Sequence, residues 1–368
     1  MRPNPLSSGG NMKKHEHRIT SFSLVFIVSF LVLLNDIVLP ENGGDFKISS
    51  ALITDKKVFK NTKYQLPKGF EAPSTHGAYF TGNAYRVRLF AKDFAQGEAV
   101  YIEIESDKNI DPSDFQAIGL YDNRSIPLSK TEWGYRGLFG ISPEEKTGLK
   151  NITILAGPKG AVSEARASVY VAKTDFPRYE SSMDLGSYSN ASSLTKETVE
   201  FIKECQRKKR IAFGTYTNTL QVTNKLAHPR DMHKITSPFY ATRVVTNYKM
   251  QGGKKIPLTP STNIHRGLDL RGLIGEPIFA MADGRVVLSE KMYYEGNLTL
   301  IDHGNGVLST YMHQDSLTVK EGDLVTAGQK IGTVGATGAV TGSHLHVSVY
   351  IRGVPVDPLG LLALPIRN

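Results

Sequence analysis

Alternating apolar and polar residues fill the chain from about residue 84 to residue 174. The clearest runs are AYRVRLFA (84–91), EAVYIEIES (98–106), LKNITILAG (149–157) and ASVYVAKT (167–174). A period of two is typical of strands with one buried face, and turn-rich pieces such as DNRS (122–125) separate the runs. The pattern predicts an immunoglobulin-like β-sandwich over residues 75–177, with Trp133 in its core.

A second β-rich region covers residues 236–368 and is rich in glycine. Between the two regions, residues 178–235 form an expected linker that starts as a Ser-rich loop and contains a helix over 194–210. Thr195 is the expected N-cap of this helix, the basic run 207–210 its C-terminal end, and Cys205 part of its packed face. The polar stretch 244–263 is expected to form a wall of a nearby groove or to cover it.

The N-terminal 45 residues have the pattern of an export signal. A basic segment, MKKHEHR (12–18), precedes the apolar run FSLVFIVSFLVLL (22–34). The run is shorter than the roughly 20 residues of a membrane-spanning helix, so residues 1–45 are a signal peptide or a retained membrane anchor, followed by a linker over 46–74. We therefore expect an exported protein of the periplasm or cell envelope, attached to the cytoplasmic membrane if the segment is kept.

Composition narrows the class of protein further. Hydrophobic residues make up 40% of the 368 residues and charged residues 21%, which is typical of a globular chain. The formal net charge of +9 suits an anionic partner such as nucleic acid, a membrane surface or an acidic wall polymer. The single cysteine, Cys205, excludes internal disulfides and CxxC metal sites.

Three clusters in the second β-rich region carry the candidate chemistry. His344 and His346 alternate on an expected strand and therefore share one face. His265 and Asp269 would share a strand face too, with Gly267 leaving open space between them, and STYMHQ (309–314) adds His313. Imidazole and carboxylate groups bind zinc, and catalytic zinc sites use three protein ligands. Five such residues are enough for three ligands and two proton-transfer groups, which points to metal-assisted hydrolysis.

These segments resemble the M23 (lysostaphin-type, LytM-domain) metallopeptidases. The resemblance lies in HRGLD (265–269), in LIDHGNGVLSTYMH (300–313) and in HLH (344–346), and it covers about residues 236–358. The preceding β-sandwich is similar to the domain found before this peptidase in Gram-negative envelope proteins. The resemblance thus implies a mainly β protein with a C-terminal peptidase domain over residues 236–368.

The resemblance also implies roles for single residues. His265, Asp269 and His346 match the ligands of one zinc ion, and His313 and His344 match the two catalytic histidines. His303 matches a family position whose expected task is to fix the HGNG turn. The implied activity is cleavage of peptide crosslinks in bacterial peptidoglycan, so peptidoglycan peptides, and not nucleic acid, are the expected partners.

Two other functions remain open on the sequence. A non-haem iron oxygenase also uses two histidines and one carboxylate, although it usually spaces them differently. A non-catalytic LytM domain would activate other wall hydrolases by binding them, and such domains typically lack some ligands. Metal content separates the three, since the oxygenase would hold iron and the activator none.

Overall fold

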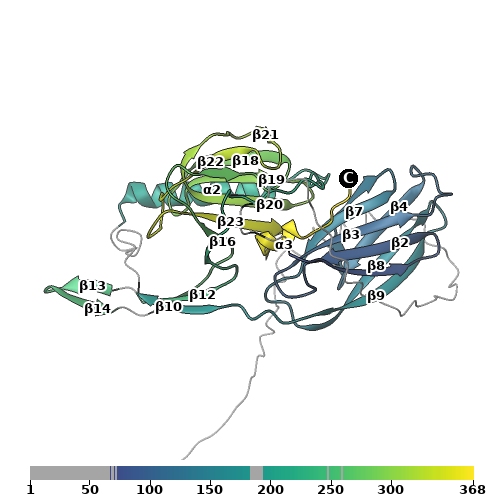
Figure 1. Ribbon diagram of the computed structural model, residues 1–368, viewed down its shortest axis with the longest axis horizontal. Helices are drawn as coiled ribbons and strands as arrows, with labels where there is room; N and C mark the ends of the chain where they lie inside the picture. The colour runs from purple at the N-terminus through teal and green to yellow at the C-terminus, as the bar shows by residue number, and fades with distance from the viewer. Residues whose placement is uncertain (1–66, 68–69, 71–72, 183–193, 247, 258–259) are drawn as a thin grey trace, which may run out of the picture.

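The computed structural model describes residues 67, 70, 73–182, 194–246, 248–257 and 260–368, and these residues are mainly β (Figure 1). Two β-rich bodies lie side by side, and the C-terminus ends at their junction (Figure 1). The expected signal or anchor segment and the linker up to residue 66 lie outside the described residues. None of the helices in the described ranges is long and apolar enough to cross a membrane.

The first body consists of two antiparallel sheets. One has five strands in the order β1 (His76–Thr81), β2 (Tyr85–Ala91), β3 (Ala99–Ser106), β7 (Gly134–Gly140) and β6 (Leu128–Thr131). The other has four, in the order β5 (Arg124–Ile126), β4 (Phe115–Tyr121), β8 (Gly148–Pro158) and β9 (Ser163–Val171).

The alternating sequence pattern explains how these two sheets pack. In β2, Val87 and Leu89 are fully buried, whereas Arg86, which precedes Val87, is exposed. Apolar residues from both sheets form one shared core, so the body is a β-sandwich. Its immunoglobulin type and its boundaries at residues 75 and 177 remain predictions.

The second body contains a ten-stranded sheet. Its main order is β11 (Ile235–Ser237), β16 (Leu268–Arg271), β23 (His344–Ile351), β20 (Val307–Leu317), β19 (Gly296–Asp302), β18 (Gly284–Met292) and β21 (Leu324–Val325). Off this path, β17 (Pro277–Phe279) pairs with β22 (Lys330–Val334), β22 also with β20, and β24 (Val354–Val356) with β23. Leu268 and Leu270 point into the core of this body, as predicted.

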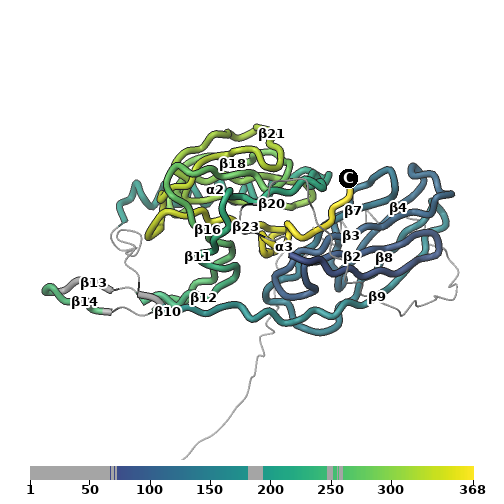
Figure 2. The backbone as a smooth tube through the Cα atoms, in the orientation of Figure 1, coloured from purple at the N-terminus to yellow at the C-terminus, as the bar shows by residue number. Residues whose placement is uncertain are grey.

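A separate three-stranded sheet borders the second body. It consists of β10 (Arg178–Ser182), β12 (Thr242–Thr246) and β15 (Ser261–Ile264), and the hairpin of β13 (Tyr248–Gln251) and β14 (Lys254–Pro257) projects from it (Figures 1 and 2). The prediction of a loop from residue 178 was wrong for the first five residues, because β10 pairs in parallel with β12. Serine has a low strand propensity, and this non-local pairing supplies the order that the local sequence lacks.

Helix α2 (Lys196–Gly214) covers one face of the large sheet. The Thr195 side chain accepts a hydrogen bond from the Thr198 amide, so the predicted N-cap is confirmed. The helix runs four residues further than predicted, and the basic run 207–210 therefore lies before the last turn. Cys205 and Ala212 are buried against β18, β19 and β20, which confirms that Cys205 is packed.

The two bodies share a packed junction. Tyr101 and Leu138, on the outer face of the five-stranded sheet, belong to one apolar core with Leu361 and Leu362 of helix α3 (Pro358–Leu362). Gly140 is required here, since a Cβ atom on it would lie 2.9 Å from Val356. The prediction that Trp133 is a core residue was wrong: it is only partly buried, and Arg367 stacks on its ring at 4.5 Å.

Candidate metal centre

Strands β23 and β16 bring the centre together by their register. His346 on β23 pairs directly with Asp269 on β16. Directly opposed residues of an antiparallel pair point to the same face, so these two side chains meet. His344 lies two residues before His346 on β23, and its Nε2 atom is 3.7 Å from Asp269 Oδ1. The predicted shared face of the two histidines is therefore confirmed.

Three potential ligand atoms converge at this point. Asp269 Oδ1 lies 2.9 Å from His265 Nε2 and 2.8 Å from His346 Nδ1, and the two nitrogens are 2.9 Å apart. Zinc at ~2.05 Å from each atom would need tetrahedral edges of about 3.3 Å, so each pair must open by only about 0.4 Å. Two imidazoles and one carboxylate thus fit a catalytic zinc site in number and in kind. Among the described residues, no other three His, Cys, Asp or Glu side chains gather in this way.

His265 reaches the centre from a different position than predicted. It follows the end of β15, and Asp269 belongs to β16, with a bend at Gly267 between them. The prediction of one continuous strand from His265 to Asp269 was therefore wrong. The amide of His265 instead donates to the Ala241 carbonyl at 2.9 Å, which holds the residue on the edge of the three-stranded sheet.

The outer nitrogen of each imidazole has a partner that fixes the ring. The Nδ1 atom of His265 lies 3.0 Å from the Pro238 carbonyl oxygen. In the same way, Nδ1 of His344 lies 2.9 Å from the Gly342 carbonyl oxygen, and Nδ1 of His313 lies 2.9 Å from that of Thr337. A carbonyl only accepts, so each Nδ1 carries the proton and each Nε2 keeps its lone pair in the neutral ring. In His346 the order is reversed, because Nε2 contacts the Ser348 hydroxyl at 2.9 Å and Nδ1 faces Asp269.

A bulge in β20 directs His313 toward the other histidines. The pairing of β20 with β19 shifts between Asn297↔Gln314 and Thr299↔Tyr311, so two residues, Met312 and His313, face one on β19. His313 has φ = 62°, in the left-handed region that non-glycine residues rarely adopt. Its ring centroid is 5.0 Å from that of His344 and 6.1 Å from that of His346. Bulges of this kind re-aim side chains next to active sites.

Burial and mutual contact shift the protonation of these groups. Burial alone would raise the pKa of Asp269, but its close contacts with the His265 and His346 rings hold that pKa well below its ordinary value. Burial, together with the neighbouring His344 and His346, lowers the pKa of His313 to about 3. Burial also lowers the pKa of His346. The carboxylate is thus ionised and these two rings are neutral, which is the protonation state in which such groups bind metals.

The sequence reasoning missed Arg243 and Ser237, which lie next to the centre. Arg243 on β12 places its Nη2 atom 2.7 Å from Asp269 Oδ2 and 2.7 Å from Ser237 Oγ. Nothing in the spacing of a lone arginine 26 residues before the aspartate signals this contact. The stretch 244–263 contributes the end of β12 and most of β15 to the sheet next to the centre, and whether it forms a wall of a groove or covers it stays a prediction.

Gly267 has a different role from the predicted one. The space beside it is occupied, because a Cβ atom there would lie 2.4 Å from Ser348 Oγ and 2.5 Å from His346 Nε2. The glycine is therefore needed for the close approach of the His346 ring to the backbone.

The remaining histidines lie away from the centre. His303 is buried, and its ring contacts the Asp283 carbonyl and the Ser309 hydroxyl, each at 2.7 Å; its task in fixing the turn remains a prediction. His228 and His233 contact each other at 3.1 Å, and His76 contacts the Lys92 carbonyl. His15 and His17 lie outside the described residues.

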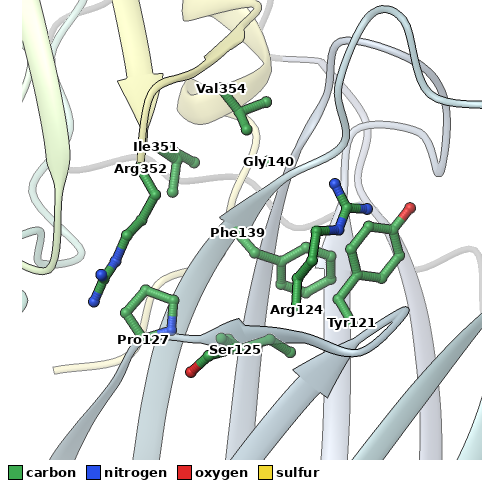
Figure 3. Close-up of a pocket in the computed structure, with 10 residues that line it drawn as sticks. Tyr121, Arg124, Ser125, Pro127, Phe139, Gly140, Ile351, Arg352 and Val354 are labelled. Carbon is green, nitrogen blue, oxygen red and sulfur yellow. The ribbon is translucent and has the colours of Figure 1, made fainter. Parts of the chain in front are cut away.

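A cavity of about 140 Å³ lies at the other end of β23 (Figure 3). Ile351, Arg352 and Val354 line one side, and residues of the sandwich, including Pro127 and Phe139, line the other (Figure 3). Five residues separate His346 from Ile351, which corresponds to about 17 Å along a strand. This cavity therefore belongs to the junction of the two bodies and not to the metal centre.

Residues 263–358 match the model of peptidase family M23. The match includes all five residues singled out by the sequence, and it confirms the resemblance drawn from the three motifs, including its Gram-negative type.

Similar proteins include a peptidoglycan endopeptidase and a murein hydrolase activator. Peptidoglycan DD-endopeptidase ShyB of Vibrio cholerae is 42% identical over 29% of this chain and 25% of its own length. Murein hydrolase activator NlpD of Escherichia coli is 41% identical over 27% of this chain and 26% of its own length. The matched part thus spans only about a quarter of these relatives. A solved structure of an M23 peptidase from Pseudomonas aeruginosa covers 73% of this chain and 95% of its own chain, with 21% identity and a TM-score of 0.49.

Proposed function

We propose that this protein is a zinc-dependent endopeptidase that cleaves peptide crosslinks of bacterial peptidoglycan. The observation that carries the proposal is the complete set of groups at one point. His265, Asp269 and His346 offer three ligand atoms, and His313 and His344 stand beside them. The DD-endopeptidase relative supports a D,D bond of the crosslink as the bond that is cut.

Three residues would hold the zinc ion and two would move protons. Bound zinc supplies a Lewis acid that polarises the peptide carbonyl. His344 and His313 keep Nε2 lone pairs, so one of them can take a proton from the attacking water and return it to the leaving amine. Once protonated, either ring can donate a hydrogen bond to the developing oxyanion. The carbonyls of Gly342 and Thr337 hold the two rings in orientation throughout.

Digestion of purified sacculi tests this function. The protein, loaded with zinc, should release muropeptides from sacculi with D-Ala–diaminopimelate crosslinks and leave glycine-bridged sacculi intact. If protein shown to contain zinc releases muropeptides from neither type of sacculus, the proposed enzymatic activity is refuted.

The NlpD relative keeps a second candidate function open, a non-catalytic activator of other wall hydrolases. Such a protein should contain no zinc and should raise the activity of a partner hydrolase in a mixed assay. The intact ligand set favours the enzyme, because an activator has no need for three converging donors and two further histidines.

We also propose that the apolar run at residues 22–34 directs export to the periplasm or cell envelope and, if retained, anchors the protein to the cytoplasmic membrane. The basic flank supports this placement. Fractionation that finds the full-length chain only in the cytosol would refute it.

A further inference from the structure

We propose that Arg243 is a positioning residue that fixes Asp269 and His265 for metal binding, an inference that rests on the proposed metal site. Neither the sequence motifs nor the family match includes this residue, since the match begins at residue 263. The argument comes from what its guanidinium contacts.

The first contact fixes the carboxylate of Asp269. Oδ1 faces His265 and His346, and Oδ2 accepts from Arg243 Nη2 at 2.7 Å. Among the described residues, no other group lies within hydrogen-bonding distance of Oδ2. The Asp269 side chain is only 9% exposed, so loss of Arg243 would leave a buried oxygen without a partner and the carboxylate free to rotate.

The second contact of Arg243 leads to His265. The same Nη2 atom donates to Ser237 Oγ at 2.7 Å, and this hydroxyl lies 3.4 Å from His265 Nδ1. Ser237 directly precedes Pro238, whose carbonyl accepts from the same Nδ1. The Arg243 guanidinium group therefore connects the Asp269 carboxylate with the segment Ser237–Pro238, which orients His265.

Strand pairing determines where Arg243 lies. On β12 it stands opposite Tyr179 of β10 and opposite Asn263 of β15, and its side chain is 29% exposed. The central strand of a sheet is a rigid support, so the guanidinium is held against the centre by backbone pairing on both sides. Arginine suits this place because its planar group presents several donors in a fixed geometry, which an ammonium does not.

The direction in which metal affinity changes when Arg243 is removed separates a positioning role from a purely electrostatic one. A positive charge beside a cation site repels the cation, so electrostatics alone predicts tighter metal binding when Arg243 is removed. Positioning predicts the opposite, because partners that orient metal ligands typically contribute 10–100-fold in affinity.

The test uses the full exported chain with zinc or cobalt as the probe. Zinc affinity is measured by competition with a chelator, and the visible spectrum of the cobalt form reports coordination geometry. The variants are Arg243→Ala, Arg243→Lys and, as the matched control, Arg178→Ala. Arg178 lies on the same sheet, is exposed, and points to the opposite face because it is adjacent to Tyr179.

We expect Arg243→Ala to bind zinc about 10–100-fold more weakly, with a changed cobalt spectrum, while Arg178→Ala matches the wild type. Arg243→Lys should fall between the wild type and Arg243→Ala. Unchanged or tighter binding by Arg243→Ala, with an unchanged spectrum, would overturn the proposal. If Arg243→Ala does not fold, Arg243→Lys decides, and wild-type affinity and spectrum in that variant overturn it. A wild-type protein that binds neither metal would refute the metal site itself.

Discussion

Replacing Gly267 with alanine tests the packing of the metal centre most directly. Gly267 does not adopt a positive φ, so alanine adds no backbone strain and acts only through its Cβ atom. That atom would lie 2.4 Å from Ser348 Oγ and 2.5 Å from His346 Nε2. The serine hydroxyl can rotate away, but the imidazole is held on its other side by Asp269 and His265.

The size of the effect follows from these distances. Ordinary van der Waals contact begins near 3.4 Å, so the His346 ring and the new methyl group must separate by about 0.9 Å. Zinc sites tolerate errors of roughly 0.2 Å in ligand distances. Even if the backbone takes up half of the separation, His346 Nδ1 leaves the range in which it can bind. We expect zinc affinity to fall by at least ~100-fold, about 2.7 kcal/mol, in the range typical of overpacking.

Chelator competition on the purified variant measures this loss, and muropeptide release should fall with zinc occupancy. Gly342→Ala is the control, because its Cβ would meet nothing within 4 Å and the carbonyl that holds His344 is unchanged. Wild-type zinc affinity in Gly267→Ala would show that the ring or the backbone relaxes freely and would refute the steric argument.

The remaining predictions concern His344 and His346, the junction and the fragment boundaries. His344→Ala should retain zinc while its rate falls by ~10²–10⁴-fold, whereas His346→Ala should lose zinc; metal analysis showing the reverse would exchange their roles. Burial and the nearby Asp357 raise the pKa of Glu98 from 4.5 to about 7, so folding disfavours its ionised form and stability falls as the pH rises through that interval. Glu98→Gln should therefore unfold at a higher temperature than the wild type at pH 8 but not at pH 4.5, and an equal difference at both pH values would contradict this. A fragment starting at residue 194 should melt at a higher temperature than one starting at residue 211, because the latter loses Cys205 from the core under α2; equal melting temperatures would argue against a structural role for the helix.

The sequence predicted those parts of the centre that depend on local periodicity. His344 and His346 share a face because β23 is a regular strand, and Leu268 and Leu270 are buried because β16 is one. The sequence also named His265 and His313 as candidates, but without their geometry. A period of two places both leucines correctly wherever the strand pairs, so this kind of prediction needs no knowledge of the rest of the fold.

The missed features all depend on pairing between distant segments. The bulge that gives His313 its positive φ arises where β20 meets β19, and the apolar pattern of YMHQ shows no sign of it. Alternation from the buried Tyr311 would have directed His313 into the core, whereas the extra residue turns its ring toward His344. His265 was placed on a regular strand for the same reason, because the bend at Gly267 follows from the packing of His346 against it.

Strand β10 has the widest consequence, because it changes how the two bodies relate to the centre. Residues 178–235 were predicted to be a linker with one helix. Instead, the chain that leaves the sandwich pairs at once with β12, and Tyr179 of β10 stands directly opposite Arg243. Arg243 in turn holds Asp269. The strand that leaves the sandwich is therefore part of the same sheet as Arg243. Tyr101 and Leu138 of the sandwich also share an apolar core with Leu361 and Leu362, so the sandwich meets the second body at this core as well as through β10.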